Sequence, residues 1–261
     1  LCQRCMSEMQ MVPETQEDSA ATAARKKNVQ SMFNAIAGRY DLLNHLLSAG
    51  IDVYWRRRAL GRYRGGRPGR VLDLATGTGD FALAARRLKS DRIVGADVAL
   101  EMVRLGRPKV ARVEPLERLR LMGGDAEHLP YRDDSFDLIT VAFGVRNFGH
   151  IPTGLAEACR VLRPGGELIV LDFTEPTLPG FRQLYQFYFK YILPTLGGWI
   201  SGNRAAYSYL PRSVGTFPQG EAFLALLNDA GFQDNRALSM SLGICAVYQG
   251  IKPGPQGSTG V

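Results

Sequence analysis

The chain has 261 residues, of which 45% are hydrophobic, and it carries a net charge of +7 with a pI of about 9.4. No run of about 18 apolar residues occurs, which argues against a membrane-spanning helix. The first residues also lack the apolar core of a secretory signal. We therefore expect a cytoplasmic protein built on one domain, with a disordered tail over residues 1–24 and a flexible tail over residues 253–261.

Cysteine and histidine are too scattered to predict a metal site or a nucleophile. Cys2 and Cys5 form a lone C-x-x-C without the second ligand pair that a zinc site needs. Cys159 and Cys245 fall within helix and strand patterns, where a thiol usually serves packing. The three histidines show no metal-ligand or catalytic-triad spacing. We therefore predict no bound metal.

Apolar residues at helical spacing predict two helices over residues 29–37 and 40–47, separated by Gly38, and a third over residues 55–63. These helices form an N-terminal cap over residues 25–64. It precedes the first strand of a single domain that we expect to span residues 25–252.

From residue 70 the chain alternates between strand and helix patterns. Strands are expected at residues 71–75, 93–97, 119–122, 136–143, 167–173, 233–238 and 243–251, and helices at residues 79–88, 100–107, 154–162 and 220–230. This alternation predicts an α/β, Rossmann-like fold with a mostly parallel seven-stranded sheet and helices on both faces. The last two strands follow each other directly, so the last strand should run antiparallel.

Residues 174–217 interrupt this rhythm with many aromatic side chains and few acids. One interpretation is a helical cap that packs on the sheet; the other is a lid over a large apolar or aromatic substrate. We expect a mixture, in which some rings pack and others line a pocket.

The turn Gly77-Thr78-Gly79 follows the first strand, and the second strand ends at Asp97. Glycines allow backbone N–H groups to approach a ligand, and an acid at this spacing typically accepts hydrogen bonds from a ribose. A nucleoside-containing cofactor is therefore predicted. The same turn, continued to Ala82, also satisfies the G-x-G-x-x-A dinucleotide pattern, so the turn alone leaves NAD open.

Asp73 is an acid inside the apolar first strand. Burying a carboxyl group is costly unless it is hydrogen-bonded. We expect Asp73 either to anchor the glycine turn or to contact the cofactor through water.

Six segments, in order along the chain, resemble the ubiquinone/menaquinone biosynthesis C-methyltransferase family. They are FNAIAGRYDLLNHLLSAGID (33–52), VLDLATGTGD (71–80), GADVALEMV (95–103), GDAEHLPYRDDSFDLIT (124–140), AFGVRNF (142–148) and EACRVLRPGGELIVLDF (157–173). The likeness covers residues 28–252. FGVRN and FNAIAGRYDLLN are the most specific parts, whereas GTGD and PGG occur in most class I methyltransferases.

The resemblance implies a class I methyltransferase that uses S-adenosyl-L-methionine. It places the cofactor against Thr78, against Asp97 with its neighbour Val98, and against Asp125 with Ala126. In this interpretation Asp97 holds the ribose hydroxyls, Asp125 meets the adenine amino group, and the Ala126 N–H meets a ring nitrogen. The glycine turn would approach the amino-acid end and the sulfonium.

The implied acceptor is a polyprenylated hydroquinone methylated on a ring carbon. Its ring becomes nucleophilic when a hydroxyl loses its proton. Arg146 and Asn147 follow the fourth strand, where open α/β sheets place ligands. We assign Arg146 to stabilising the phenolate and Asn147 to orienting a hydroxyl or a water. His150 is either a proton acceptor or a surface residue, and in this family a tyrosine matching Tyr40 closes over the cofactor.

Demethylmenaquinol is our first choice of acceptor, with 2-polyprenyl-6-methoxy-1,4-benzoquinol as the alternative. A nucleic-acid methyltransferase is disfavoured, because the segment after the fourth strand lacks the prolines of (N/D)-P-P-(Y/F). An NAD-dependent oxidoreductase lacks a Tyr-x-x-x-Lys set, and an inactive binding module would not need every cofactor residue. Arginines over residues 56–70 suggest peripheral contact with the inner face of the plasma membrane, and a homodimer stays open.

Overall fold

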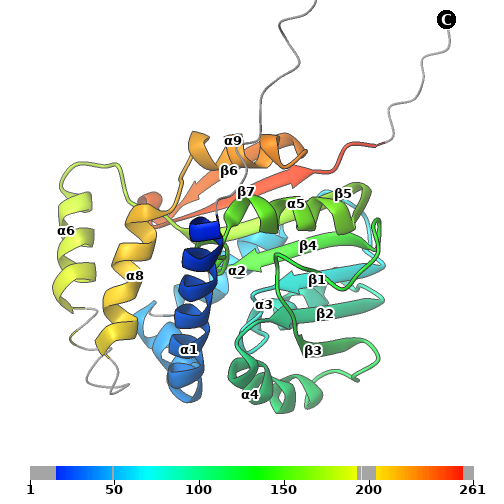
Figure 1. Ribbon diagram of the computed structural model, residues 1–261, viewed down its shortest axis with the longest axis horizontal. Coiled ribbons are helices and arrows are strands. Elements are labelled where there is room, and N and C mark those ends of the chain that lie inside the picture. Colours follow the sequence, from blue (N-terminus) through cyan, green and yellow to red (C-terminus); the bar gives the residue numbers. More distant parts are fainter. Residues whose placement is uncertain (1–15, 49, 193–194, 196–203, 255–261) are drawn as a thin grey trace, which may run out of the picture.

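The computed structural model describes residues 16–48, 50–192, 195 and 204–254, and it is built around a seven-stranded sheet (Figure 1). The strands are β1 (Arg70–Leu74), β2 (Arg92–Asp97), β3 (Leu119–Gly123), β4 (Phe136–Ala142), β5 (Leu162–Phe173), β6 (Gln233–Met240) and β7 (Cys245–Ile251). The longer helices are α1 (Gln16–Leu47), α2 (Ile51–Leu60), α3 (Asp80–Ala85), α4 (Leu100–Ala111), α5 (Ile151–Val161), α6 (Phe181–Phe187), α8 (Arg204–Thr216) and α9 (Glu221–Asp229). Short helical turns are η1 (Arg86–Leu88), η2 (Val145–Asn147), η3 (Tyr188–Ile192) and η4 (Ser241–Gly243).

The strand order is β3-β2-β1-β4-β5-β7-β6. The pairs among the first five strands are parallel, whereas β7 runs antiparallel to both β5 and β6. The predicted Rossmann-like class and the antiparallel last strand are therefore confirmed. Strands β1 and β4 are neighbours at the centre of the sheet. The chain continues from β1 to β2 on one side and from β4 to β5 on the other. The crevice between the carboxyl ends of β1 and β4 is therefore the expected ligand site of such a fold.

Two apolar cores lie on opposite faces of the sheet. On one face, α5 and α9 pack against alternate residues of the central strands, including Leu72 and Ile139. On the other face, α2, α3 and α4 pack against the intervening residues, including Val71 and Leu138. This alternation places Asp73, two residues after Val71, on the face that α2 and α3 cover.

Helix α1 corrects two expectations from the sequence. It is continuous from Gln16 to Leu47, so the predicted tail is helical from Gln16 onward and Gly38 does not divide two helices. The segment before residue 25 is rich in alanine, the best helix former, and an interior glycine costs only about 1 kcal/mol. Ala37 is buried against Ala99 and Met102, and this packing offsets the cost of Gly38. Residues 1–15, with Cys2 and Cys5, lie outside the described residues.

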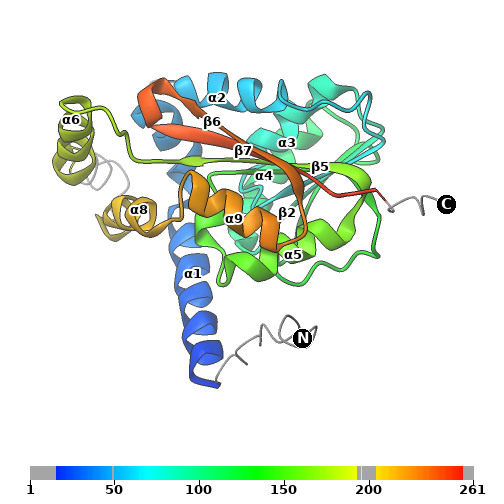
Figure 2. The same ribbon diagram turned by 90° about the horizontal axis from the view of Figure 1, so that it is seen from above.

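The aromatic insertion contains α6, η3 and α8, which stand beside the end of the sheet (Figures 1 and 2). Part of it packs as predicted: Tyr185 and Phe189 stack with ring centroids 4.1 Å apart, and Phe189 meets Phe173 of β5 at 6.3 Å. Residues 193–194 and 196–203 lie outside the described part of the chain, as do the side chains of Arg204 and Tyr207.

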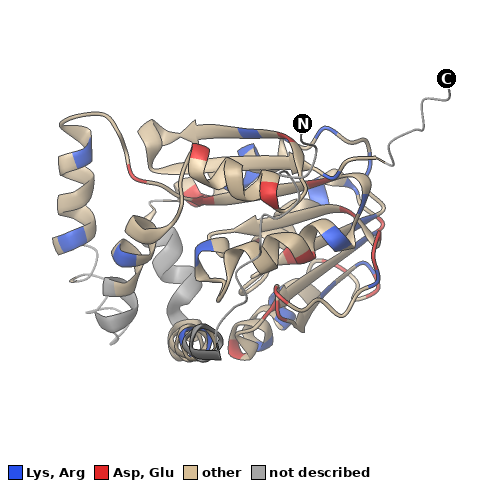
Figure 3. Ribbon diagram, turned by 45° about the horizontal axis from the view of Figure 1, so that its top comes forward, with Lys and Arg blue, Asp and Glu red and all other residues tan. Residues whose placement is uncertain are grey.

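Acidic and basic residues alternate over the loops at the amino ends of the strands (Figure 3). Among the arginines over residues 56–70, Arg56 is buried and Arg67 pairs with Asp91, whereas others are exposed, namely Arg57, Arg58, Arg64 and Arg70. Within the described ranges, no helix is both long and apolar enough to cross a bilayer.

Candidate active site

A pocket lies at the carboxyl edge of the sheet, where β1, β2, β3 and β4 end. The loops after these strands form its walls, and α1 contributes Lys26, Val29 and Phe33. Helix α1 runs past this edge of the sheet (Figures 1 and 2). We call this cavity the main pocket. Six of the predicted site residues meet in this pocket and line it, namely Gly77, Asp97, Val98, Asp125, Ala126 and Asn147.

The glycine turn forms one wall through its backbone. Gly77 and Gly79 have φ angles of +57° and +90°, a region that favours glycine. A Cβ on Gly79 would lie 3.0 Å from Leu121 Cδ1, so Gly79 also permits close packing behind the turn. The Thr76 amide donates to the Ala96 carbonyl at 3.1 Å and ties the turn to β2. Gly77 itself lines the main pocket.

Asp97 ends β2 and is largely buried. Its two carboxylate oxygens accept the amides of Gly77, at 2.7 Å, and Ala99, at 2.8 Å. Burial raises the pKa of Asp97, while these amides and that of Val98 favour the ionised form. A carboxylate oxygen can accept two hydrogen bonds, so Asp97 keeps capacity for hydroxyl donors from a ligand.

Asp73 is held between the glycine turn and β4. The Thr76 and Thr140 hydroxyls donate to its two oxygens at 2.5 Å and 2.7 Å. Burial raises the pKa of Asp73 to about 6, against the opposing effect of these hydrogen bonds and of the Arg56 charge. The Thr76 contact anchors the turn, one of the two roles expected for this acid. Its contact with a cofactor stays a prediction.

Helix α1 is fastened across the main pocket by polar contacts. Lys26 forms an ion pair with Asp125 and lies 3.3 Å from Glu127 Oε2. Gln30 Nε2 donates to the Val98 carbonyl at 2.7 Å. Burial pushes the pKa of Asp125 upward, but the hydrogen bond and charge of Lys26 outweigh it and the net shift is downward. Asp125 is therefore ionised at neutral pH.

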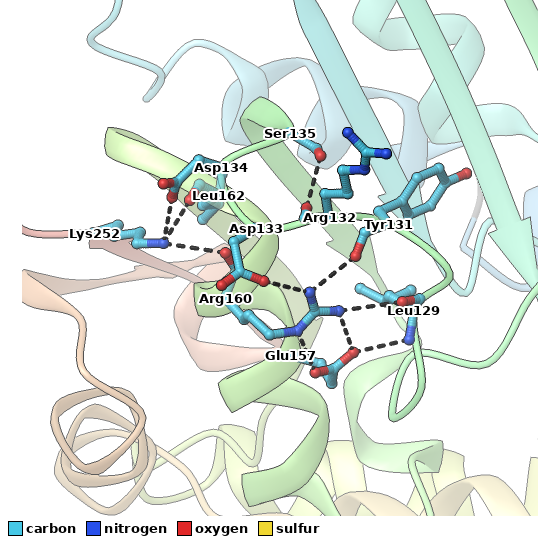
Figure 4. A network of polar contacts seen from close by, with 10 residues as sticks. All are labelled: Leu129, Tyr131, Arg132, Asp133, Asp134, Ser135, Glu157, Arg160, Leu162 and Lys252. Atoms are coloured by element: carbon cyan, nitrogen blue, oxygen red, sulfur yellow. Dashed lines mark hydrogen bonds and ion pairs between the residues drawn. The ribbon is translucent and has the colours of Figure 1, made fainter.

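The loop that carries Asp125 is braced from behind by Arg160 of α5 (Figure 4). The guanidinium donates to the Tyr131 carbonyl at 2.9 Å and to Asp133 Oδ1 at 2.7 Å. It also pairs with Glu157, which accepts the Leu129 amide at 2.9 Å. This network fixes the loop after β3 against α5 and so positions the Asp125 wall of the pocket.

A second cavity adjoins the main pocket on the α2 side of the glycine turn and shares Gly77 and Phe143 with it. We call it the polar cavity. Its polar lining comprises Arg56, Asp73, Thr76, Thr78 and Asp80. Thr78 Oγ1 accepts a hydrogen bond from Lys109 Nζ at 2.9 Å, and the same amine donates to Asp80 at 2.6 Å. The structure therefore places Thr78 at the polar cavity.

Arg146 lies in η2, directly after β4, and is buried. Its guanidinium forms an ion pair with the fully buried Asp172 of β5 and donates to the Phe143 carbonyl at 2.7 Å. It also lies over the Phe173 ring, 5.4 Å from the centroid. Within the described part of the chain, Arg146 Nε has no hydrogen-bond partner. The sequence did not identify Asp172 as the partner of Arg146.

Asn147 links η2 to the aromatic insertion, because its Oδ1 accepts a hydrogen bond from the Tyr209 hydroxyl at 3.0 Å. His150 caps α5, with Nδ1 2.7 Å from Thr153 Oγ1 and accepting from the Thr153 amide at 3.4 Å. His150 therefore acts as the N-cap residue of α5. Tyr40 falls within α1, but its side chain lies outside the described residues.

The model of the ubiE/COQ5 methyltransferase family matches residues 21–252. The chain belongs to this family. The resemblance seen in the six sequence segments is therefore confirmed over nearly the whole described domain. As a member of this family, the protein is a methyltransferase.

Curated relatives match over most of their length. Demethylmenaquinone methyltransferase of Thermus thermophilus is 48% identical over 223 residues, which cover 85% of this chain and all of the relative. The enzyme of the same name from Bacteroides fragilis is 41% identical over 229 residues, 87% of this chain and 94% of the relative. Ubiquinone/menaquinone biosynthesis C-methyltransferase UbiE of Geotalea daltonii is 46% identical, covering 87% and 97%.

Solved structures share the fold at low identity. A SAM-dependent methyltransferase of Thermotoga maritima has a TM-score of 0.60 at 20% identity, covering 86% of this chain and 99% of that chain. Phosphoethanolamine N-methyltransferase 2 of Haemonchus contortus, in complex with S-adenosyl-L-methionine, has a TM-score of 0.57 at 14% identity and covers 76% and 52%. These similarities confirm the class I methyltransferase fold.

Besides Asp172, the sequence missed Lys26 and Arg56. Lys26 was visible only as part of the basic run Arg25-Lys26-Lys27, which is usually a solvated surface. Arg56 was hidden among the arginines before β1 in the same way. A signal was present for Arg56: it follows Trp55 and lies one helical turn after Asp52, so an inward-facing ion pair was conceivable.

Proposed function

We propose that this ubiE/COQ5-family protein transfers the methyl group of S-adenosyl-L-methionine to a ring carbon of demethylmenaquinol, giving menaquinol. The observation that carries the proposal is the position of the family-specific segment 142–148. Phe143, Gly144 and Asn147 of this segment line the main pocket together with Asp97 and Asp125. The names of relatives at 41–48% identity support the same acceptor.

The residues of the main pocket suit the nucleoside of this cofactor. Asp97 would accept the ribose hydroxyls, and the Asp125 carboxylate has lone pairs for both Lys26 and an adenine amino group. Phe33 and Met102 add apolar surface for a purine ring. When bound, S-adenosylmethionine supplies an electrophilic methyl group.

On the acceptor side, Arg146 would stabilise the oxygen of the hydroquinone as it loses its proton. Asp172 fixes the guanidinium, and Nε retains a donor for that oxygen. Asn147, held by Tyr209, would orient the hydroxyl or a water. Phe173 and Phe189 offer aromatic surface nearby. These roles follow from the ion pair and contacts described above and are proposals.

The related acceptor 2-polyprenyl-6-methoxy-1,4-benzoquinol is the second candidate, since relatives at 45–46% identity are named for both quinone pathways. Purified protein, incubated with S-adenosylmethionine and each quinol in detergent micelles, separates the two. Mass spectrometry should find the naphthoquinol heavier by one methylene group. Methylation of the benzoquinol alone would favour the second candidate, and no product from either quinol would contradict both.

We also propose that the protein contacts a membrane surface peripherally, where a polyprenylated acceptor resides. Leu184, Phe187 and Tyr191, on α6 and η3, are exposed large apolar side chains. Lys190 and Arg182 lie on the same segment. Exposed aromatic and aliphatic side chains beside cations are typical of contact with an anionic lipid surface.

A further inference from the structure

Arg56 of α2 is buried although it carries a charge, and one donor of its guanidinium is unused. Its Nη1 donates to the buried carboxylate of Asp52, which also accepts the Ser48 hydroxyl at 2.8 Å. Its Nε is buried and has no hydrogen-bond partner among the described residues. A buried donor without a partner costs free energy, so such a group beside a cavity is a candidate contact for a ligand.

The unused donor belongs to the edge of Arg56 that is suited to a carboxylate. Nε and Nη2 form one edge of the guanidinium, and this edge binds carboxylates with two parallel hydrogen bonds. Nη2 lies 3.9 Å from Asp80 Oδ2, which is longer than a hydrogen bond. Asp80 is instead bonded to Lys109 at 2.6 Å. Arg56 lines the polar cavity, so its guanidinium borders the space that a ligand there would occupy.

The polar cavity has the charges to hold both ends of an amino acid. Arg56 supplies a cation, and Asp73 and Asp80 supply acids. The cavity adjoins the main pocket through Gly77 and Phe143, so one molecule can occupy both. S-adenosylmethionine consists of a nucleoside joined to an amino-acid group that carries one carboxylate and one ammonium.

We propose that Arg56 binds the α-carboxylate of S-adenosylmethionine through its Nε and Nη2 edge, with the ammonium facing the acids of the polar cavity. This assignment rests on the proposed cofactor and not on the identity of the acceptor. Asp52 is then the residue that positions Arg56, because its carboxylate holds the opposite side of the guanidinium. In this proposal the glycine turn contributes backbone and Arg56 contributes the charge.

Binding of two ligands that differ only in the carboxylate tests the proposal. Calorimetric titration would compare S-adenosylmethionine with its decarboxylated form for the wild type, Arg56→Gln and Arg58→Gln. Arg58 is an exposed arginine of the same helix and serves as the matched control. A charge-assisted pair of this kind should contribute about 10- to 100-fold in affinity. Arg56→Gln should lose that factor for S-adenosylmethionine and change less than about 3-fold for the decarboxylated form.

Arg56→Gln leaves Asp52 buried without its cation, so folding needs a separate control. The double variant Asp52→Asn/Arg56→Gln removes both charges and should reproduce the same ligand selectivity, with circular dichroism confirming the fold. Equal losses for both ligands, or no loss for S-adenosylmethionine, would refute the role of Arg56. If the wild type bound neither ligand, the cofactor itself would be wrong, and that result is distinct from a failure of Arg56 alone.

Discussion

Asp73 places an ionisable group in the middle of β1, and its environment predicts an unusual dependence of stability on pH. Burial raises the pKa of Asp73 from 3.8 to about 6. The folded protein therefore binds this proton more tightly than the unfolded chain does. The contribution of Asp73 to stability should be fully present below its unfolded pKa and should be lost as the pH rises through its folded pKa. With ~1.4 kcal/mol for each pKa unit, the loss should approach about 3 kcal/mol.

Asp73→Asn provides the reference, because it keeps the shape of the side chain but cannot ionise. Urea unfolding between about pH 4 and pH 7 would give the free energy of unfolding of both proteins. The wild type should lose about 2.5 kcal/mol relative to the variant over this range, while other titrating groups cancel. If the free energies of unfolding of the two proteins changed in parallel with pH, Asp73 would not titrate as its burial predicts.

Arg146 and Asp97 should affect different steps. Arg146→Lys keeps a cation beside Asp172 but loses the guanidinium donors, so kcat should fall about 100-fold. Affinity for S-adenosylhomocysteine should stay within about 3-fold of the wild type.

Asp97→Asn should show the opposite pattern and weaken the affinity for S-adenosylhomocysteine at least about 10-fold, since it removes a charged acceptor. Turnover rates and titration calorimetry measure the two effects, and a normal kcat for Arg146→Lys would reject its assignment.

At this scale the sequence identified residues whose chemistry conflicts with their surroundings. Asp73 stands among apolar strand residues, and Asp97 ends a strand at a spacing typical of a ribose acceptor. Lys26 gave no such contrast, and for Arg56 the only signal was its spacing from Asp52, because each lies in a basic run that also fits a solvated surface. Their burial and pairing depend on how α1 and α2 dock on the sheet, and this docking is not encoded locally.

At the scale of elements, α1 should be held over the main pocket partly by Lys26. Lys26→Met removes the ion pair with Asp125 and the contact with Glu127. A partly exposed pair contributes at most about 1 kcal/mol, so amide exchange in the first half of α1 should accelerate by up to about 5-fold. Amides of β1 and β4 should not change.

Lys27→Met is the matched control, since Lys27 is the exposed neighbour on the same helix. Hydrogen exchange followed by mass spectrometry should leave its α1 peptides at the wild-type rate. The same acceleration in both variants would point to a general effect on helix propensity. Unchanged exchange in Lys26→Met would mean that Gln30 and the apolar contacts of α1 suffice.

All seven predicted strands occur in the structure. Central strands such as β1, β4 and β5 were predictable because each combines a short apolar run with a turn signal. Helix α1 was predicted incorrectly because local cues favoured breaks at Gly38 and disorder before residue 25. Tertiary packing of Ala37 on Met102 decided the outcome. The insertion over residues 174–217 was recognised by composition, but its contact with the site through Tyr209 required the structure.

At the scale of the whole molecule, the exposed apolar residues are unevenly placed around the site. Helix α6 and η3 stand beside the carboxyl edge of the sheet (Figure 2), and they carry Leu184, Phe187 and Tyr191 at the surface. A substrate with a polyprenyl tail would enter most directly from a membrane on this side. In the arginine-rich segment, which the sequence suggested for this contact, Arg56 is buried and Arg67 pairs with Asp91, while Arg57 and Arg58 are exposed.

Flotation with liposomes containing anionic phosphatidylglycerol at low salt tests this orientation. The wild type should float, and Leu184→Ser/Phe187→Ser should reduce the bound fraction at least about 5-fold, because two large apolar side chains each contribute about 1.5–3 kcal/mol when buried. Leu116→Ser is the matched control, since Leu116 is 58% exposed in the loop before β3, at the amino ends of the strands. Equal loss in both variants, or a wild type that stays unbound, would exclude α6 as the membrane-facing element. If binding depended on charge alone, salt would release the wild type and both variants from the liposomes to the same extent.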